Sequence, residues 1–154
     1  MTPDDLIDVA RSLASGGGPG AAGQARWRRS ISTAYYAVFH ALARLCADAL
    51  VDAEGSAEWV LVCRALDHAQ SKNTLTALSR EMDDPTLRIV AKRFSDLQLE
   101  RQDADYHPTR TFTQTEAEAW LQIAVEAVRD VGGLTHDQRR VLAVRLHFRV
   151  RPVR

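Results

Sequence analysis

Apolar residues recur every three or four positions along most of the chain, a spacing that places side chains on one face of an α-helix. Six stretches follow this pattern and are expected to be helices. They cover residues 3–14, 23–51, about 57–78, 85–107, 114–131 and 134–147. The third becomes irregular at Ser71, Lys72 and Asn73, where we expect a break or a kink.

Several of these helices are preceded by residues that favour a helix N-terminus. Thr2 and Ser56 can each accept a hydrogen bond from a backbone N–H of the first turn. Asp84 can do the same for the helix that begins at Pro85, because proline suits the first helical position. Pro108 requires that helix to end at or just before His107.

The last two helices are bounded differently. Thr113 and Glu116 form a capping box, and the helix that they begin is expected to end at Gly132 and Gly133. The final segment is ambiguous, since residues 144–150 alternate between apolar and polar side chains as a strand does. No second strand is expected that could pair with it, so we favour a helix to about residue 147 and an extended tail.

Together these elements predict an all-α fold, a mostly antiparallel bundle of five or six helices. The glycine-rich stretch 16–23 follows a helix and is expected to be a flexible connector. We expect one domain over residues 1–154, with its core in residues 25–131 and a basic C-terminal helix and tail in residues 134–154.

The long helix at 23–51 is apolar over a broad arc and must therefore contact other elements on more than one side. One edge of it is polar, with Arg29, Thr33, Tyr36, His40 and Arg44 in a row. Arg29, Tyr36 and His40 are candidates for binding a phosphate or a nucleotide base. The alternative is a solvated edge or the rim of a dimer interface.

Arg101 interrupts the apolar face of the helix that begins at Pro85. That face comprises Leu87, Val90, Ala91, Phe94, Leu97 and Ala104. A buried guanidinium without a partner is costly, so an anionic group must meet Arg101. Three sources are open: Asp105 one turn later, a group across a dimer interface, or a phosphate. In the first case Arg101 and Asp105 neutralise each other inside the bundle, with Tyr106 packed beside them.

Composition supports one folded domain, since the 154 residues are 45% hydrophobic and 26% charged. No apolar run approaches the roughly 20 residues that span a bilayer, and the acidic N-terminus differs from a signal peptide. We therefore expect a cytoplasmic protein that does not bind membranes. Cys46 and Cys63 fit no metal-ligand spacing and are expected to be reduced thiols.

The formal net charge is zero, which disfavours nucleic-acid binding by bulk electrostatics. The distribution is uneven, because residues 139–154 carry six arginines and no acidic residue. That segment could contact phosphates or an acidic partner, or could be a solvated helix end. His68, His136 and His147 are expected to be surface residues without partners.

No glycine-rich phosphate loop, nucleophile elbow or metal-ligand motif is present, so we expect neither a metal nor a cofactor. Two separated segments nevertheless resemble one family. RRSISTAYYAVFHA at 28–41, and RQDADYHP at 101–108 followed by Phe112 and Thr113, resemble the HEPN superfamily of helical nucleotide-binding domains. The resemblance extends from about Ala25 to Val131 and matches small prokaryotic members.

The resemblance implies a homodimer that cleaves RNA without a metal ion, as the toxin of a toxin–antitoxin pair or in phage defence. In such proteins an arginine and a histidine separated by four to six residues line a shared cleft, and here Arg101 and His107 enclose five. The arginine would hold the scissile phosphate, and the histidine would act as a general acid or base. Asp103, Asp105 and Tyr106 would support this pair.

Two other functions are compatible with the same residues. The chain could be a non-catalytic HEPN module that binds a nucleotide or a partner protein, such as an antitoxin or a nucleotidyltransferase. It could also be a structural dimerisation bundle in which Asp105 is the only partner of Arg101. In either case His107 would be an exposed turn residue before Pro108 rather than a catalyst.

Overall fold

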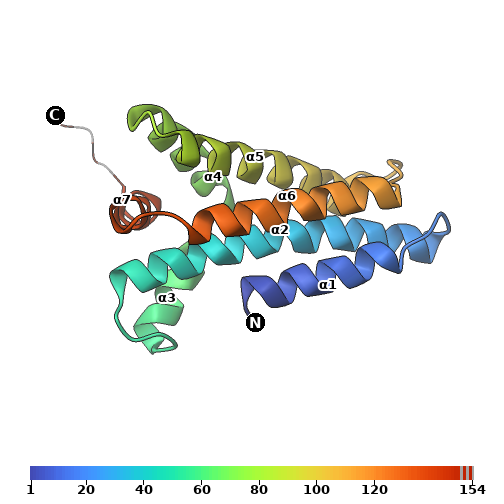
Figure 1. The fold of residues 1–154 in the computed structure, drawn as a ribbon, viewed down its shortest axis with the longest axis horizontal. Helices are drawn as coiled ribbons and strands as arrows, with labels where there is room; N and C mark the ends of the chain where they lie inside the picture. The colour runs from blue at the N-terminus through green and yellow to red at the C-terminus, as the bar shows by residue number, and fades with distance from the viewer. Residues whose placement is uncertain (150, 152, 154) are drawn as a thin grey trace.

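The structure, a computed structural model, describes residues 1–149, 151 and 153, and this part of the chain forms seven helices and no strand (Figure 1). The helices are α1 (Pro3–Ser15), α2 (Ala21–Leu50), α3 (Ala57–Ala65), α4 (His68–Glu81), α5 (Pro85–Tyr106), α6 (Gln114–Gly132) and α7 (His136–His147). The predicted all-α fold is confirmed. There are seven helices rather than five or six because the third expected helix is divided into α3 and α4.

The division between α3 and α4 lies at Leu66 and Asp67, so the predicted break at residues 71–73 is wrong. Both residues have extended backbones, and Leu66 is buried. The Asp67 side chain accepts a hydrogen bond from the backbone N–H of Gln70 at 2.7 Å and caps α4. Ser71 lies inside α4, where its hydroxyl donates to the Asp67 carbonyl. The Asp67 N-cap therefore starts a new helix although the apolar spacing continues, and no glycine or proline marks the boundary.

The predicted N-caps are confirmed. Thr2 and Thr113 each form a complete capping box, Ser56 caps α3, and the Asp84 side chain accepts from two N–H groups of α5. The ambiguous C-terminal segment is helical to His147, so the strand alternative is wrong for residues 144–149. Val150 lies outside the described residues.

The glycine-rich connection between α1 and α2 is closely packed, in contrast to the flexible connector that we expected. A Cβ on Gly17 would lie 2.1 Å from Nε1 of Trp27, and one on Gly23 would lie 2.2 Å from the backbone nitrogen of Gly18. The indole of Trp27 donates to the carbonyl of Ala14 at 3.0 Å, which ties α2 to the end of α1. Glycine is needed here because the connector lies directly against the first turns of α2.

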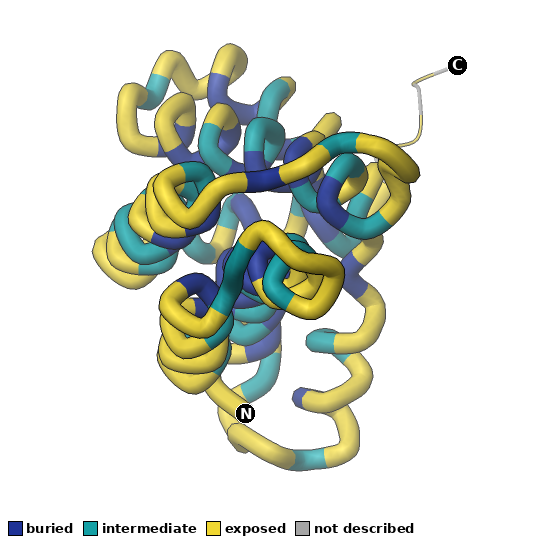
Figure 2. Tube along the Cα trace, turned by 90° about the vertical axis from the view of Figure 1, so that its right-hand side faces the viewer, coloured by how far each residue is buried: buried dark blue, intermediate teal, exposed yellow. Residues whose placement is uncertain are grey.

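Helix α2 lies at the centre of the bundle, with α1 and α6 alongside it and α7 across one end (Figure 1). It is buried on several sides, as its broad apolar arc predicted. Tyr35, Leu42 and Cys46 of α2 join Phe94 of α5 and Leu142 of α7 in one core cluster. Seen along the bundle, the buried segments face inward and the exposed ones outward (Figure 2).

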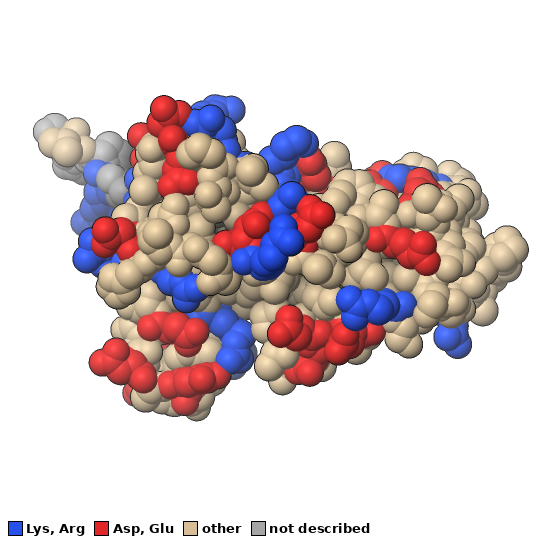
Figure 3. Space-filling model, in the orientation of Figure 1, with Lys and Arg blue, Asp and Glu red and all other residues tan. Residues whose placement is uncertain are grey.

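Charged side chains of both signs are interspersed on the face shown in Figure 3. Among the described residues, no helix combines the length and the apolar character that a bilayer crossing requires. Cys46 and Cys63 are free thiols, as expected. Burial, together with the nearby Cys63, raises the pKa of Cys46 to about 12, so this thiol stays protonated at neutral pH.

Candidate functional site

Arg101 lies on the buried face of α5, as the sequence predicted. The other positions of this face are buried: Leu87, Val90, Ala91, Phe94, Leu97 and Ala104. The Arg101 side chain is only 12% exposed, and its guanidinium carbon lies 5.3 Å from the centre of the Tyr35 ring. The negative π face of an aromatic ring attracts a cation. Arg101 is thus held between α5 and α2.

Arg101 retains hydrogen-bonding capacity despite this burial. Its expected contact with Asp105 is present, with a terminal guanidinium nitrogen 3.5 Å from Oδ2, longer than a charge-assisted hydrogen bond. The same carboxylate accepts from Ser32 Oγ at 3.2 Å and lies 4.0 Å from Arg29. Within the described residues, the buried Nε of Arg101 has no hydrogen-bond partner. That nitrogen is out of reach of a ligand. One carboxylate serves two guanidinium groups at 3.5 and 4.0 Å, so the terminal nitrogens of Arg101 can still meet a further anion.

A surface hollow of about 570 Å³ lies at the end of α5. It is lined by Arg101, Gln102, Asp103, Tyr106, His107 and Pro108. A continuous helix would place His107 about 120° around the axis from Arg101. The helix instead ends at Tyr106, and His107 has an extended backbone with φ −72° and ψ 118°. The His107 N–H still bonds to the Asp103 carbonyl at 2.9 Å, so the extended ψ redirects the chain only after His107. His107 and Arg101 both line the hollow all the same. Tyr106 is 75% exposed, so it does not pack inside the bundle.

His107 has a defined role in the turn that follows α5. Its Nδ1 accepts hydrogen bonds from the backbone N–H groups of Thr109, at 3.4 Å, and Arg110, at 3.0 Å. A nitrogen that accepts from N–H groups is unprotonated, so in the neutral ring Nε2 carries the proton. His107 can donate a hydrogen bond from Nε2 in this arrangement. It can accept a proton at Nε2 only if Nδ1 releases these N–H groups.

Two polar residues of α2 hold the same turn in place. Arg28 donates to the carbonyls of Asp103, at 3.4 Å, and Ala104, at 2.9 Å, and also to the carbonyl of Arg110. Gln24 both donates to and accepts from the backbone of Phe112, at 2.7 and 2.9 Å. The last carbonyls of a helix lack partners within it, and Arg28 satisfies that of Ala104; the Asp103 carbonyl also accepts from the His107 N–H. Sequence reasoning missed both residues.

Arg110 neutralises the acidic residues around the turn. Its guanidinium lies 2.5 Å from Glu100, which is 10% exposed, and 2.6 Å from Asp103. Partial burial lowers the pKa of Arg110, but the hydrogen bonds that Arg110 donates to these two carboxylates outweigh burial and raise the pKa. Asp103 lines the hollow, yet its carboxylate is engaged with Arg110. Its role is therefore to fix the turn.

A second pair of polar groups lies beneath Arg101. The Tyr35 hydroxyl and His68 Nδ1 are 2.6 Å apart, and the His68 ring stacks on Phe39 with centroids separated by 3.9 Å. Burial, and next the positive charge of Arg101, lower the pKa of His68. The Gln98 amide donates to the His68 carbonyl at 3.0 Å. The prediction that His68 is a surface residue without partners is wrong.

The prediction of a surface residue without partners is also wrong for His147, whereas His136 is at the surface as predicted. His147 Nε2 lies 2.8 Å from the carbonyl oxygen of Val62, so this residue attaches α7 to α3. His136 is exposed at the start of α7.

The three residues of α2 proposed to bind phosphate or nucleotide do not share one hollow. Arg29 is largely exposed and near Asp105. Tyr36 packs edge-on against Tyr35 and His68, at centroid distances of 5.4 and 5.9 Å. His40 lines a separate hollow of about 310 Å³ with Phe39, Ala43, Cys63, Arg64, Leu66 and His68. Burial, then the N-terminal ammonium and Arg44, lower the pKa of His40.

In the part of the chain that the structure describes, no group of three or more His, Cys, Asp or Glu residues could hold a metal ion. Comparisons with protein families, curated proteins and solved structures find no match to this chain.

Proposed function

We propose that this chain is a HEPN-type domain that acts on RNA as a homodimer and cleaves it without a metal ion. One observation supports this proposal above the others. The Arg101 guanidinium, whose contact with Asp105 is as long as 3.5 Å, lines an open hollow together with a histidine whose Nε2 is free to contact a ligand. The chain would then act as the toxin of a toxin–antitoxin pair or in phage defence.

In the proposed reaction, Arg101 donates to the non-bridging oxygens of the scissile phosphate and stabilises the charge that develops on them. The ribose 2′-oxygen attacks phosphorus, the 2′-O–P bond forms and the bond to the 5′-oxygen breaks. One proton leaves the 2′-hydroxyl and another reaches the 5′-oxygen; His107 would carry one of these transfers once its Nδ1 is released from the turn, and water would carry the other. RNA is the substrate because DNA lacks the 2′-hydroxyl.

The hydrogen bonds of the turn make the role of His107 conditional on local opening. With Nδ1 accepting from Thr109 and Arg110, Nε2–H can donate to a phosphate oxygen. To take a proton from the 2′-hydroxyl at Nε2, the ring must release the two N–H groups and carry its proton on Nδ1. The exposure of residues 106–109 leaves room for such a rearrangement.

The test is cleavage of labelled RNA by the purified protein with EDTA present. Arg101→Ala and His107→Ala should each lower the cleavage rate at least about 100-fold. His107→Asn is the informative companion, because an asparagine oxygen can accept from the Thr109 and Arg110 N–H groups yet cannot transfer a proton. Equal cleavage by the wild type and all three variants would contradict the proposal.

A second function is favoured by the engagement of His107 Nδ1 within its own turn. In this alternative the chain is a non-catalytic HEPN module that binds a nucleotide or a partner protein such as a nucleotidyltransferase. Arg101 still meets phosphate, whereas His107 only shapes the turn. The expected result is no RNA cleavage, a nucleotide-dependent rise in melting temperature that Arg101→Ala abolishes, and full binding by His107→Asn.

A further inference from the structure

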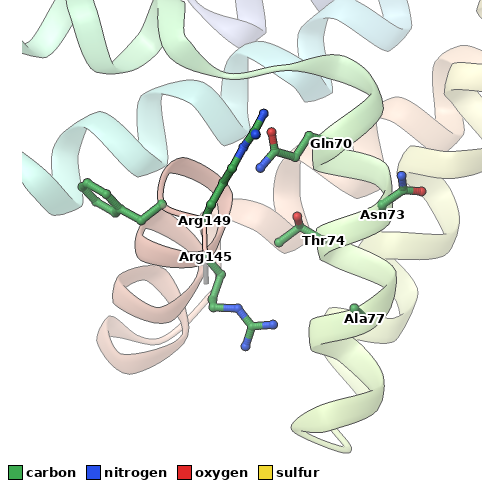
Figure 4. A pocket seen from close by; sticks show the side chains of 7 residues that line it. Gln70, Asn73, Thr74, Ala77, Arg145 and Arg149 are labelled. Carbon is green, nitrogen blue, oxygen red and sulfur yellow. The ribbon is translucent and has the colours of Figure 1, made fainter. Parts of the chain in front are cut away.

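A second hollow lies between α4 and α7, at the end of the bundle opposite the α5–α6 turn (Figure 1). Its volume is about 470 Å³. Helix α4 contributes one face, and the end of α7 with the residues after it contributes the other (Figure 4). The lining residues are Gln70, Asn73, Thr74, Ala77, Arg145, Phe148 and Arg149. We call this hollow the α4–α7 groove.

The polar side chains of the α4–α7 groove are rich in hydrogen-bond donors. Two amides, a hydroxyl and two guanidinium groups line it, and none of its lining residues is acidic. Within the described residues, the side chains of Gln70, Asn73 and Arg149 form no hydrogen bond. The side chain of Arg149 extends toward Gln70 in Figure 4. Arg145 is paired with Glu81, so Arg149 and the two amides are the donors that could bind an anion here.

Arg149 differs from the arginines that precede it in the basic C-terminal segment. Arg139 donates to the carbonyls of Gly132 and Leu134, at 2.5 and 2.9 Å. Arg140 lies 3.2 Å from Asp137, and Arg145 forms two hydrogen bonds with the Glu81 carboxylate, at 2.7 and 3.1 Å. These three arginines thus have partners inside the fold. Arg149 has none among the described residues, so its charge is available to a ligand.

We propose that the α4–α7 groove is a second phosphate-binding site, which holds the backbone of the RNA strand at a distance from Arg101. Arg149 binds the phosphate, and the amides of Gln70 and Asn73 hydrogen-bond to neighbouring oxygens of the strand. The proposal rests on the proposed action on RNA for the source of the phosphate. Because backbone contacts position a strand without reading its sequence, the groove contributes affinity and no sequence preference.

The test is RNA binding by fluorescence anisotropy, using a single-stranded RNA of about 16 nucleotides at several salt concentrations. Arg149→Ala should weaken binding about tenfold, equally for RNAs of different sequence. Losing one phosphate contact should also reduce the slope of log affinity against log salt by about 0.7. Arg140→Ala is the control, because it removes an arginine from the same basic segment but not from the groove.

An unchanged salt slope in Arg149→Ala, or an equal change in Arg140→Ala, would overturn the groove proposal. A parallel arm uses AMP and inorganic phosphate as probes in a melting assay. If they stabilise the wild type but not Arg149→Ala while RNA binding is equal, the groove holds a free nucleotide and the strand proposal fails. Cleavage tests the other proposal separately: Arg149-dependent RNA binding without cleavage would contradict the proposed ribonuclease function and support the groove.

Discussion

Arg101 on α5 and Arg110 in the turn after it lie at the same end of the bundle and are paired very differently. Arg110 is the more exposed, at 30% against 12%, yet it meets Glu100 and Asp103 at 2.5 and 2.6 Å. Arg101 is the more buried, yet its closest carboxylate oxygen is 3.5 Å away. If the fold only required each buried charge to be neutralised, the more buried guanidinium would have the shorter ion pair.

The contrast separates an arginine that stabilises the turn from one that is available for binding. Arg110 saturates two carboxylates, one of them nearly buried, so the turn depends on it. Arg101 forms a cation–π contact with Tyr35 and shares Asp105 with Arg29. We therefore expect substitutions of Arg101 to change activity more than stability, and substitutions of Arg110 to do the reverse.

The largest expected effect is that of Arg101→Met on RNA cleavage. This variant keeps much of the buried volume and removes the phosphate donors, so the rate should fall about 100- to 1000-fold. Its free energy of unfolding should stay within about 1 kcal/mol of the wild type, because the Arg101–Asp105 contact is long, at 3.5 Å, and Asp105 keeps Ser32 and Arg29 as partners. Urea unfolding measures the stability; a loss above about 3 kcal/mol would make Arg101 a structural residue instead.

Arg110→Ala should have the next largest effect, this time on stability. It leaves the Glu100 carboxylate nearly buried without its partner, which should cost about 2–3 kcal/mol in urea unfolding. Adding Glu100→Gln should recover part of that loss, because a neutral amide is less costly to bury unpaired. Arg140→Ala removes the exposed Arg140–Asp137 pair and should change stability by less than about 1 kcal/mol. Equal losses of stability in Arg110→Ala and Arg140→Ala would contradict the greater importance of the buried pair.

His107 should show a smaller effect on stability that depends on the replacement. His107→Ala removes an acceptor for the N–H groups of Thr109 and Arg110 and should cost about 1 kcal/mol. His107→Asn should restore most of it, since its side-chain oxygen can accept from the same groups. Equal stability of the two variants in urea would show that these hydrogen bonds contribute little.

The smallest expected effect is a pH dependence that links Arg101 to His68. The folded state lowers the pKa of His68 through burial and the Arg101 charge, so the unfolded chain binds more protons. This contribution to stability is present above about pH 6.5 and is lost as the pH falls below it. In Arg101→Met the pKa of His68 should rise toward its ordinary value. NMR titration of the ring measures it, and an unchanged pKa would contradict the coupling.

The features that could be predicted from the sequence depend on local pattern. The apolar face that contains Arg101, the N-cap at Asp84 and the capping box at Thr113 each involve residues close in sequence, and the structure has all three. Asp105, one turn from Arg101, was found in the same way.

The features that could not be predicted depend on partners far apart in the chain. Arg28 binds backbone carbonyls 75 and 76 residues later, and every residue has a carbonyl, so no residue type marks the contact. His68 contacts Tyr35, which lies 33 residues earlier in the chain. In the sequence, His68 has the pattern of a solvated residue at the start of a helix, because the contact exists only once α2 packs against it. The start of α4 was missed because Asp67 follows an apolar run that continues the helical spacing.

The hydrogen bonds that Gln24 and Arg28 make to the α5–α6 turn also limit how early during synthesis of the chain the hollow can form. Gln24 is synthesised 88 residues before Phe112, its partner. At ordinary rates of translation, α2 waits roughly 4 to 18 s for that partner to be made. The turn that borders the hollow therefore cannot be fixed by α2 before Phe112 has been synthesised. A nascent chain would expose no finished Arg101 site to the RNA around it until most of its length had been translated.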